Sequence, residues 1–244
     1  MKAKLAVGLV GVTRTTIGGI CDRFGGQVQT GPFGGQLHAS DYRDAGIPVV
    51  MPQDMVGGQI LTDKIARVPP EHAKRLSTHV LRSGDIVFSR RGDVARFAVI
   101  TGREEGWLCG TGSIRVRLNS PDIDVRYVRR YLQQAAIRAW LEHNAKGVTM
   151  ANLNTAIVRG VPISFPCIGE QRRIADILDA ADTLRARRRE ALALAKTLAQ
   201  SIFVEMFGDP IENTHAFTVQ KLIELVDPAR PLTYGILMPG QDVD

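Results

Sequence analysis

The most constraining feature of the chain is the segment between residues 170 and 207, which contains neither glycine nor proline. The segment is rich in Ala, Leu, Arg and Glu, which are good helix formers. Apolar residues recur every seven positions in two sets, and only Arg188 and Glu205 interrupt the resulting seam. The residues expected to pair across this seam are Ile174, Ile177, Ala181, Leu184, Ala191, Leu198 and Ile202.

About 36 helical residues make a rod about 54 Å long, which is more than a small globular domain needs. Gly208, followed by Pro210, is typical of a helix end. A single helix does not bury an apolar seam by itself. We therefore expect a partner helix in this chain or in another. The alternative is an amphipathic helix that lies on its own domain.

Residues 16–120 show a different pattern, with short β-branched runs bounded by Gly, Pro, Asp or Ser. The clearest is 113–118, where apolar residues alternate with Arg115 and Arg117, so we expect a strand with one apolar face and one arginine-bearing face. The other runs are 46–50, 79–89 and 96–101.

Residues 122–143 carry a helical apolar stripe, and 146–166 predict a loop, a helical turn and a strand. The expected fold class is α+β, in which a β-rich domain is followed by one long coiled-coil-type helix. The expected domains are a β-rich domain over 1–167, a helix over 168–209, and a linker with the start of a second β-rich domain over 210–244.

The net charge of +6 is unevenly distributed along the chain. Residues 1–167 carry +9, residues 168–210 are neutral, and residues 211–244 carry −3. Arginine dominates the basic excess, and its guanidinium fork suits phosphate groups and the guanine edge. A polyanion partner for the first domain is one reading of this pattern, and a generally basic surface without a partner is the other.

Motifs of common enzyme sites are missing from the sequence. There is no phosphate-binding G-x-x-x-x-G-K-[ST], no G-x-G-x-x-G, no H-E-x-x-H and no G-x-S-x-G. The five histidines lack metal-ligand spacing, and the three cysteines lie far apart, so we expect reduced, packing cysteines in a cytoplasmic protein. No apolar run has the length of a membrane helix.

Residues 161–210 resemble the conserved segment of the specificity (S) subunit of type I restriction-modification systems, in which a proline-bounded strand leads through Glu-Gln-x-x-Ile into a long helix. Residues 31–55 and 81–100 are similar to the opening loop and the central hairpin of that family's target recognition domain, and 232–240 to the opening of its second one. The matching residues of the conserved segment are Pro162, Pro166, Glu170, Gln171, Ile174, Ile177, Leu178, Phe203, Phe207 and Gly208.

This resemblance implies a non-catalytic subunit that recognises one half of a split DNA site. In the family, the helices fix the gap between the half-sites and dock methylation subunits, and restriction subunits join that complex. S-adenosylmethionine and ATP with Mg are then expected on the partner subunits, with no cofactor on this chain. A full subunit carries two recognition domains and two helices, so we expect a half-length or truncated form, in a prokaryotic cytoplasm.

Two copies are expected to pair through the seam and present two identical domains to the DNA. Base reading needs forked or amide side chains on loops and strand edges, and phosphate contacts need donors beside them. The candidate DNA-binding residues are Gln36, Gln53, Arg90, Arg91, Arg96, Thr111, Ser113, Arg115, Lys146, Thr149, Asn152 and Asn154, with Arg90 and Arg91 favoured most.

Two alternatives from other classes stay open at this point. One is a coiled-coil scaffold or adaptor without specific DNA binding. The other is a stand-alone nuclease or methyltransferase with dispersed catalytic residues. DNA-binding and activity assays, with and without a methylation subunit, distinguish the three.

Overall fold

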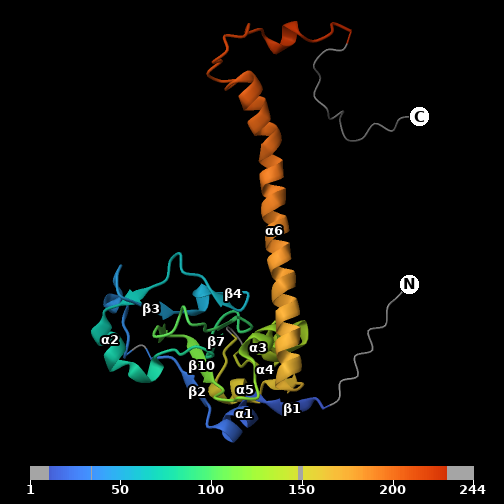
Figure 1. The fold of residues 1–244 in the computed structure, drawn as a ribbon. Coiled ribbons are helices and arrows are strands. Elements are labelled where there is room, and N and C mark those ends of the chain that lie inside the picture. The colour runs from blue at the N-terminus through green and yellow to red at the C-terminus, as the bar shows by residue number, and fades with distance from the viewer. Residues whose placement is uncertain (1–10, 34, 148–150, 230–244) are drawn as a thin grey trace, which may run out of the picture. The chain divides into compact units, whose positions relative to one another are not determined.

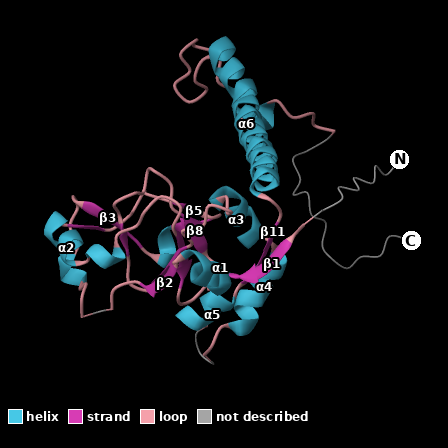
Figure 2. Ribbon diagram, turned by 60° about the horizontal axis from the view of Figure 1, so that its bottom comes forward, coloured by secondary structure: helices cyan, strands magenta, loops and turns pink. Residues whose placement is uncertain are grey.

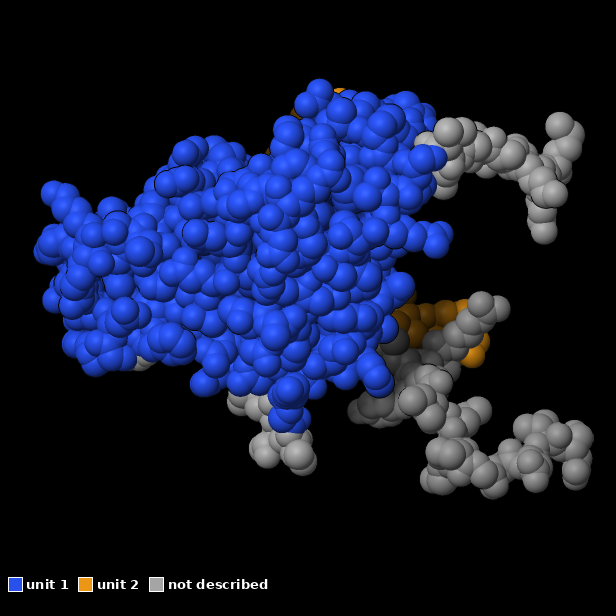
Figure 3. Space-filling view, turned by 90° about the horizontal axis from the view of Figure 1, so that it is seen from below, with its two compact units in different colours: residues 1–182 blue, residues 183–244 orange. Residues whose placement is uncertain are grey.

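The computed structural model describes residues 11–33, 35–147 and 151–229, and it has the expected α+β class (Figure 1). The chain divides into two compact units, residues 1–182 and residues 183–244 (Figure 3). The division falls inside the long helix, so the domain boundaries at 167 and 209 stay a prediction.

The first unit holds all the strands of the described residues, and they form four small sheets. The strands are β1 (Thr13–Thr16), β2 (Gln27–Thr30), β3 (Ile47–Val50), β4 (Met55–Val56), β5 (Gln59–Ile60), β6 (Arg67–Val68), β7 (Ile86–Ser89), β8 (Phe97–Val99), β9 (Leu108–Cys109), β10 (Ser113–Arg117) and β11 (Pro162–Phe165).

Most helices are short, and only the last is long. The α-helices are α1 (Ile17–Phe24), α2 (Pro70–Arg75), α3 (Val125–Leu132), α4 (Ala135–Asn144), α5 (Thr155–Gly160) and α6 (Ile168–Phe207). Short 3-10 segments lie at Ala39–Asp41, Pro52–Asp54, Ser77–His79 and Leu222–Glu224.

The central element is an antiparallel sheet with the strand order β2-β10-β7-β8. On one face, Phe88 and Ile114 pack with residues of α1, α3, α4 and α5 in the main hydrophobic cluster. On the other face, Val87 packs in a second cluster that includes Met55 and Cys109. Strand β7 is buried along its whole length because both faces of the sheet are covered.

This second cover removes Arg115, a predicted DNA-binding residue, from the surface of β10. Its apolar residues face the main cluster as predicted, but the opposite face of the strand does not lie open. Arg115 is only 3% exposed, and Arg117 is bound to the buried Asp85 by hydrogen bonds of 2.6 and 2.7 Å. Alternation along a strand predicts two faces, but it does not show whether a distant segment covers the second one.

Strands β1 and β11 pair antiparallel outside the central sheet, with Thr13 opposite Phe165 (Figure 2). Strand β1 runs directly into α1, and Ile17 N donates a hydrogen bond to Val161 O at 3.0 Å. Strand β11 leads into α6 through Pro166 and Cys167. The entry and the exit of the domain are thus held together.

The long helix is confirmed, and its 40 residues span about 60 Å. It ends at Phe207 because Gly208 adopts a left-handed conformation, with φ of 74°. The predicted helical stretch 122–143 is instead two helices, interrupted at Gln133 and Gln134, where Gln134 has an extended ψ of 140°. Of the expected second domain start over 210–244, residues 230–244 lie outside the described part.

Candidate nucleic-acid interface

Loops from several segments meet at one end of the central sheet. Gly31, just after β2, donates from its N to Ser113 O at 2.8 Å, and Arg90, just after β7, donates to Gly112 O at 2.8 Å. A Cβ on Gly31 would lie 2.0 Å from the backbone oxygen of Gly110, so only glycine permits this approach. The sequence between β9 and β10 is therefore in contact with both neighbouring loops.

Two further segments join the same end. Leu153 N donates to Arg90 O at 2.8 Å, while Lys146 and Asn152 pair through their backbones at 2.8 and 3.0 Å. Pro52 lies beside Gly112. We call the resulting surface the loop face. Among the predicted residues it includes Gln36, Arg90, Arg91, Thr111, Lys146 and Asn152, and Gln53 follows Pro52 at its edge.

The charged residues among the predicted members of the loop face are Arg90, Arg91 and Lys146, and all three are basic. Arg91 and Lys146 are exposed, and Arg90 is half-buried with its guanidinium 5.7 Å from the ring centre of Phe33. The Nε of Arg90 is buried without a hydrogen-bond partner among the described residues. A cluster of cationic donors on loops is suited to phosphate groups and to base edges.

Arg96 lies in the same hairpin as Arg90, between β7 and β8, but its charge is partly neutralised. Its Nε donates to Asp93 at 3.2 Å, and Asp93 also accepts from Arg138 at 3.3 Å. Both arginine side chains are about half exposed. Arg96 therefore lies at the edge of the loop face with a competing intramolecular partner.

Other candidates are placed where contact with a ligand would require rearrangement. Arg115 donates to Gln27, Gln29 and to two backbone oxygens, and burial is the main reason why its pKa is lowered. Ser113 is 1% exposed. The side chain of Asn154 accepts from Ile157 N at 2.8 Å and caps α5. Thr149 lies outside the described residues.

Gln171 has a role that the sequence did not reveal. Its side chain is fully buried, with Nε2 donating to Asp122 O at 2.8 Å and to Pro166 O at 2.9 Å. Its Oε1 accepts from Asp124 N at 3.0 Å. One amide therefore connects the end of β11, the start of α3 and the first turn of α6. The Glu170-Gln171 pair of the conserved segment marked this position in the sequence, but it did not reveal the partners of the Gln171 side chain.

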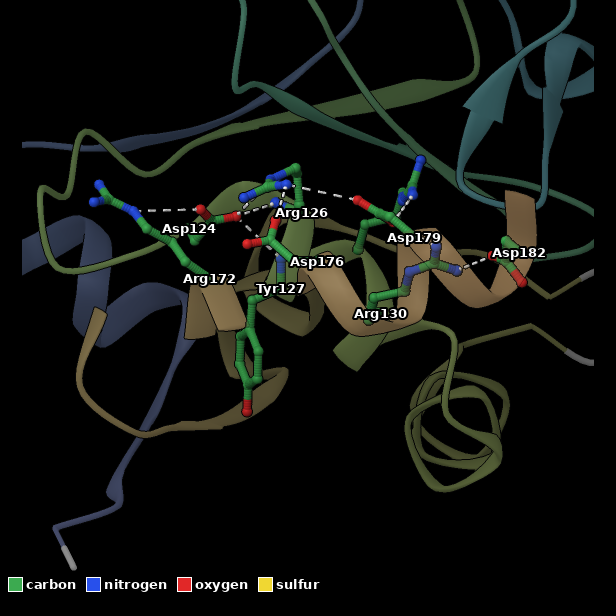
Figure 4. A network of polar contacts seen from close by, with 9 residues as sticks. Asp124, Arg126, Tyr127, Arg130, Arg172, Asp176, Asp179 and Asp182 are labelled. Carbon is green, nitrogen blue, oxygen red and sulfur yellow. Dashed lines mark hydrogen bonds and ion pairs between the residues drawn. The ribbon is translucent and has the colours of Figure 1, made fainter. Parts of the chain in front are cut away.

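A second contact between α3 and α6 is a series of ion pairs, which we call the α3–α6 ladder (Figure 4). Arg126 bonds to Asp176 at 2.7 Å, and Arg129 bonds to Asp179 at 2.9 Å. Arg130 bonds to Asp179 and to Asp182. Its side chain is only 13% exposed. These arginines contribute to the basic excess of the first domain, but their charge is already paired within the protein.

A cleft of about 620 Å³ lies at the opposite end of the central sheet from the loop face. It is lined by residues that include Arg82, Asp85, Arg117, Asp124 and Arg172. Most of these charges are paired: Arg117 with Asp85, and Arg172 with Asp124 at 3.8 Å. None of the predicted DNA-binding residues lines this cleft.

The described residues offer neither a metal site nor a membrane span. No group of three or more His, Cys, Asp or Glu side chains is arranged to hold a metal ion there. Within the same residues, no helix combines the length and apolar character needed to cross a membrane.

The apolar seam of α6 is exposed over most of its length. Leu184 is 65% exposed, Leu198 57% and Ile202 45%. Ile177 and Ala191 are also exposed, whereas Ile174 and Ala181 are half-buried. Contact of α6 with the rest of the first unit therefore buries only the first turns of the seam.

Comparisons with known proteins give a consistent result. A model of the type I restriction modification DNA specificity domain matches residues 40–193. The type I restriction enzyme EcoBI specificity subunit of Escherichia coli is 23% identical over 174 residues, covering 68% of this chain and 36% of that subunit. The chain thus spans little more than a third of this relative's length.

Solved structures have a similar fold. A chain from a study of complex assembly and conformational transition of the type I R-M system has a TM-score of 0.57 at 19% identity, over 82% of this chain and 46% of that one. The type I restriction-modification S subunit from M. genitalium has a TM-score of 0.53 at 16% identity, over 88% of this chain and 50% of that one.

Proposed function

The chain belongs to the type I restriction-modification DNA specificity family, and on that premise we propose that its loop face reads one half of a split DNA site. The family has a role in DNA sequence recognition and is in general non-catalytic. The observation that carries the proposal is the convergence of Arg90, Arg91 and Lys146 with amide side chains at one sheet end. Cationic donors supply affinity for phosphates, and forked or amide side chains supply base discrimination.

The α6 helix has a separate part in the proposal. The α3–α6 ladder and Gln171 fix its first turns on the recognition domain, and its exposed apolar seam favours a second helix as its partner. We propose that α6 docks a methylation subunit, that restriction subunits join this complex, and that it acts in a prokaryotic cytoplasm. S-adenosylmethionine and ATP with Mg then belong to the partner subunits.

The DNA contacts are tested by salt dependence. Replacing Arg90 and Arg91 by alanine is expected to weaken duplex binding and to lower the slope of log K against log salt by about one to two. Arg103→Ala is the matched control because Arg103 is 64% exposed and lies beyond the other end of β8. An unchanged slope in the double variant, or an equal effect in the control, contradicts the assignment.

Sequence recognition is tested by selecting bound duplexes from a random pool, with and without a methylation subunit. Enrichment of one sequence, and adenine methylation only when both subunits are present, is the expected result. If the chain is a scaffold or adaptor, the selection is expected to enrich no sequence. A stand-alone nuclease or methyltransferase acts on DNA without the partner subunit. Methylome sequencing of cells with and without this chain checks the same prediction in vivo.

Pairing of two chains through the seam is the third part of the proposal. Leu198 and Ile202 lie on this seam and are roughly half exposed. Sedimentation at tens of micromolar is expected to show a dimer, and Leu198→Arg is expected to shift it to a monomer because the charge would be buried at the contact. A monomeric wild-type chain at that concentration contradicts the pairing.

A further inference from the structure

Phe33 is an exposed aromatic side chain at the loop face. It is 60% exposed, and it is the one aromatic among the large hydrophobic side chains that are exposed in the described part of residues 1–182. It lies in the loop that follows β2, three residues from Gln36. An apolar ring that projects into water gains free energy when a partner covers it.

Phe33 and the residues bonded to it are held by several hydrogen bonds. Phe33 N donates to Gln36 Oε1 at 3.2 Å, and Gln36 N donates to Phe33 O at 2.7 Å. Arg75 donates to Gln36 O at 2.9 Å, and Gly31 is bonded to Ser113 on β10. Phe33 and Gln36 are therefore bonded to each other and, through Arg75, to α2, and such bonds lower the entropy lost on binding.

Arg90 provides the second half of the arrangement. Its guanidinium lies 5.7 Å from the ring centre of Phe33, within the range of a cation–π contact. Its backbone N and O are both bonded, to Gly112 and to Leu153. The arginine fork that faces the aromatic ring is thus carried by a backbone bonded on both sides.

We propose that Phe33 is a specificity-determining residue that contacts the 5-methyl group of a thymine in the major groove, next to a guanine read by Arg90. This inference rests on the proposed function. Phenylalanine is one of the side chains that contact this methyl group, and arginine pairs with the O6 and N7 atoms of guanine. The separation of 5.7 Å lies between one base-pair step of about 3.4 Å and two such steps.

The major groove is favoured over the minor groove by the neighbours of Phe33. Gln36 and Arg91 are amide and fork side chains, which discriminate bases where each base pair has its own donor and acceptor pattern. The competing arrangement is insertion of the ring as a wedge between base steps from the minor groove, which unstacks them.

The test uses the full chain and the duplex sequence selected from the random pool. Each thymine is replaced in turn by deoxyuridine, which removes only the methyl group. For the wild type, one substitution within two base pairs of a guanine is expected to weaken binding about fourfold, the factor for one buried methyl group. In Phe33→Ala, the thymine and deoxyuridine duplexes are expected to bind equally.

Two controls separate the ring contact from other effects. Ile211→Ala removes an apolar side chain that is 93% exposed beyond α6, and it should keep the thymine preference. Arg90→Lys keeps the charge but loses the fork, and it should reduce the preference for the adjacent guanine while the methyl effect remains.

The outcomes distinguish this inference from the proposed function. A methyl effect that disappears only in Phe33→Ala supports the inference. Three results overturn the inference and leave the proposed function intact, provided that binding is sequence-specific. The first is no methyl effect, and the second is a methyl effect that survives Phe33→Ala. The third is a Phe33-dependent rise in 2-aminopurine fluorescence, which marks unstacking. Failure to select any sequence overturns the proposed function as well.

Discussion

Gln171 offers the sharpest test of how the start of α6 is attached to the rest of the first unit. Its buried amide makes three hydrogen bonds, to Asp122 O, Pro166 O and Asp124 N, at 2.8, 2.9 and 3.0 Å. Gln171→Ala leaves these backbone groups without that partner, at a cost of about 1 kcal/mol each. We expect a loss of about 3 kcal/mol in the free energy of unfolding, or roughly 6–12 °C in Tm for a chain of this size.

Gln171→Glu is nearly isosteric and makes the prediction more specific. An ionised carboxylate cannot donate to Asp122 O or Pro166 O, whereas a protonated one can donate to one of them. Burial beside two carbonyl oxygens raises the pKa of the new carboxyl group above its unfolded value of about 4.3. The destabilisation therefore grows as pH rises through the folded-state pKa, and it shrinks as pH falls toward 4.

The assay is chemical or thermal unfolding of both variants and the wild type at pH 5 and pH 8. Gln134→Ala is the control because Gln134 is exposed and makes no capping hydrogen bond, so a change within about 0.5 kcal/mol is expected. A loss below 1 kcal/mol in Gln171→Ala, or a deficit of Gln171→Glu that is the same at both pH values, refutes the reasoning.

Three further predictions concern the first unit. Asp179→Ala removes an acceptor shared by two partly buried arginines and is expected to lower the free energy of unfolding by about 1–2 kcal/mol. Thermal unfolding compares it with Glu142→Ala, whose ion pair is about half exposed and for which a loss of about 0.3–0.5 kcal/mol is expected. Iodoacetamide at pH 8 is expected to label Cys167, because the other two cysteines are buried, and mass spectrometry of the peptides checks this. Burial raises the pKa of Asp54, so the ionised carboxylate opposes folding above that pKa. Asp54→Asn is therefore expected to have a higher Tm than the wild type at pH 7 and the same Tm below pH 4.

Features specified by local sequence could be predicted well. The long helix follows from a run of helix formers and ends at a glycine that adopts positive φ. Arg90 and Arg91 directly follow the β-branched run 79–89, and they lie between β7 and β8. Their contact with DNA stays a prediction. In both cases the determining residues are near neighbours along the chain.

Features that depend on distant segments could not be predicted in the same way. Arg115 is buried because residues near 78–80 and the side chains of β2 surround it, 35 or more positions away. The partners of Gln171 on the α3 side lie 47 and 49 positions before it. The α3–α6 ladder joins residues about 50 positions apart, although arginines and aspartates at matching helical spacing were an available signal.

The pairing of β1 with β11 has a consequence for how such a protein can change. Thr16 lies opposite Pro162, so everything between them leaves and returns at one place beside the base of α6. A domain with adjacent ends can be exchanged as a block without altering the segments that flank it. A different set of loops could therefore be grafted between these two strands, as long as α3 keeps the arginines of the α3–α6 ladder.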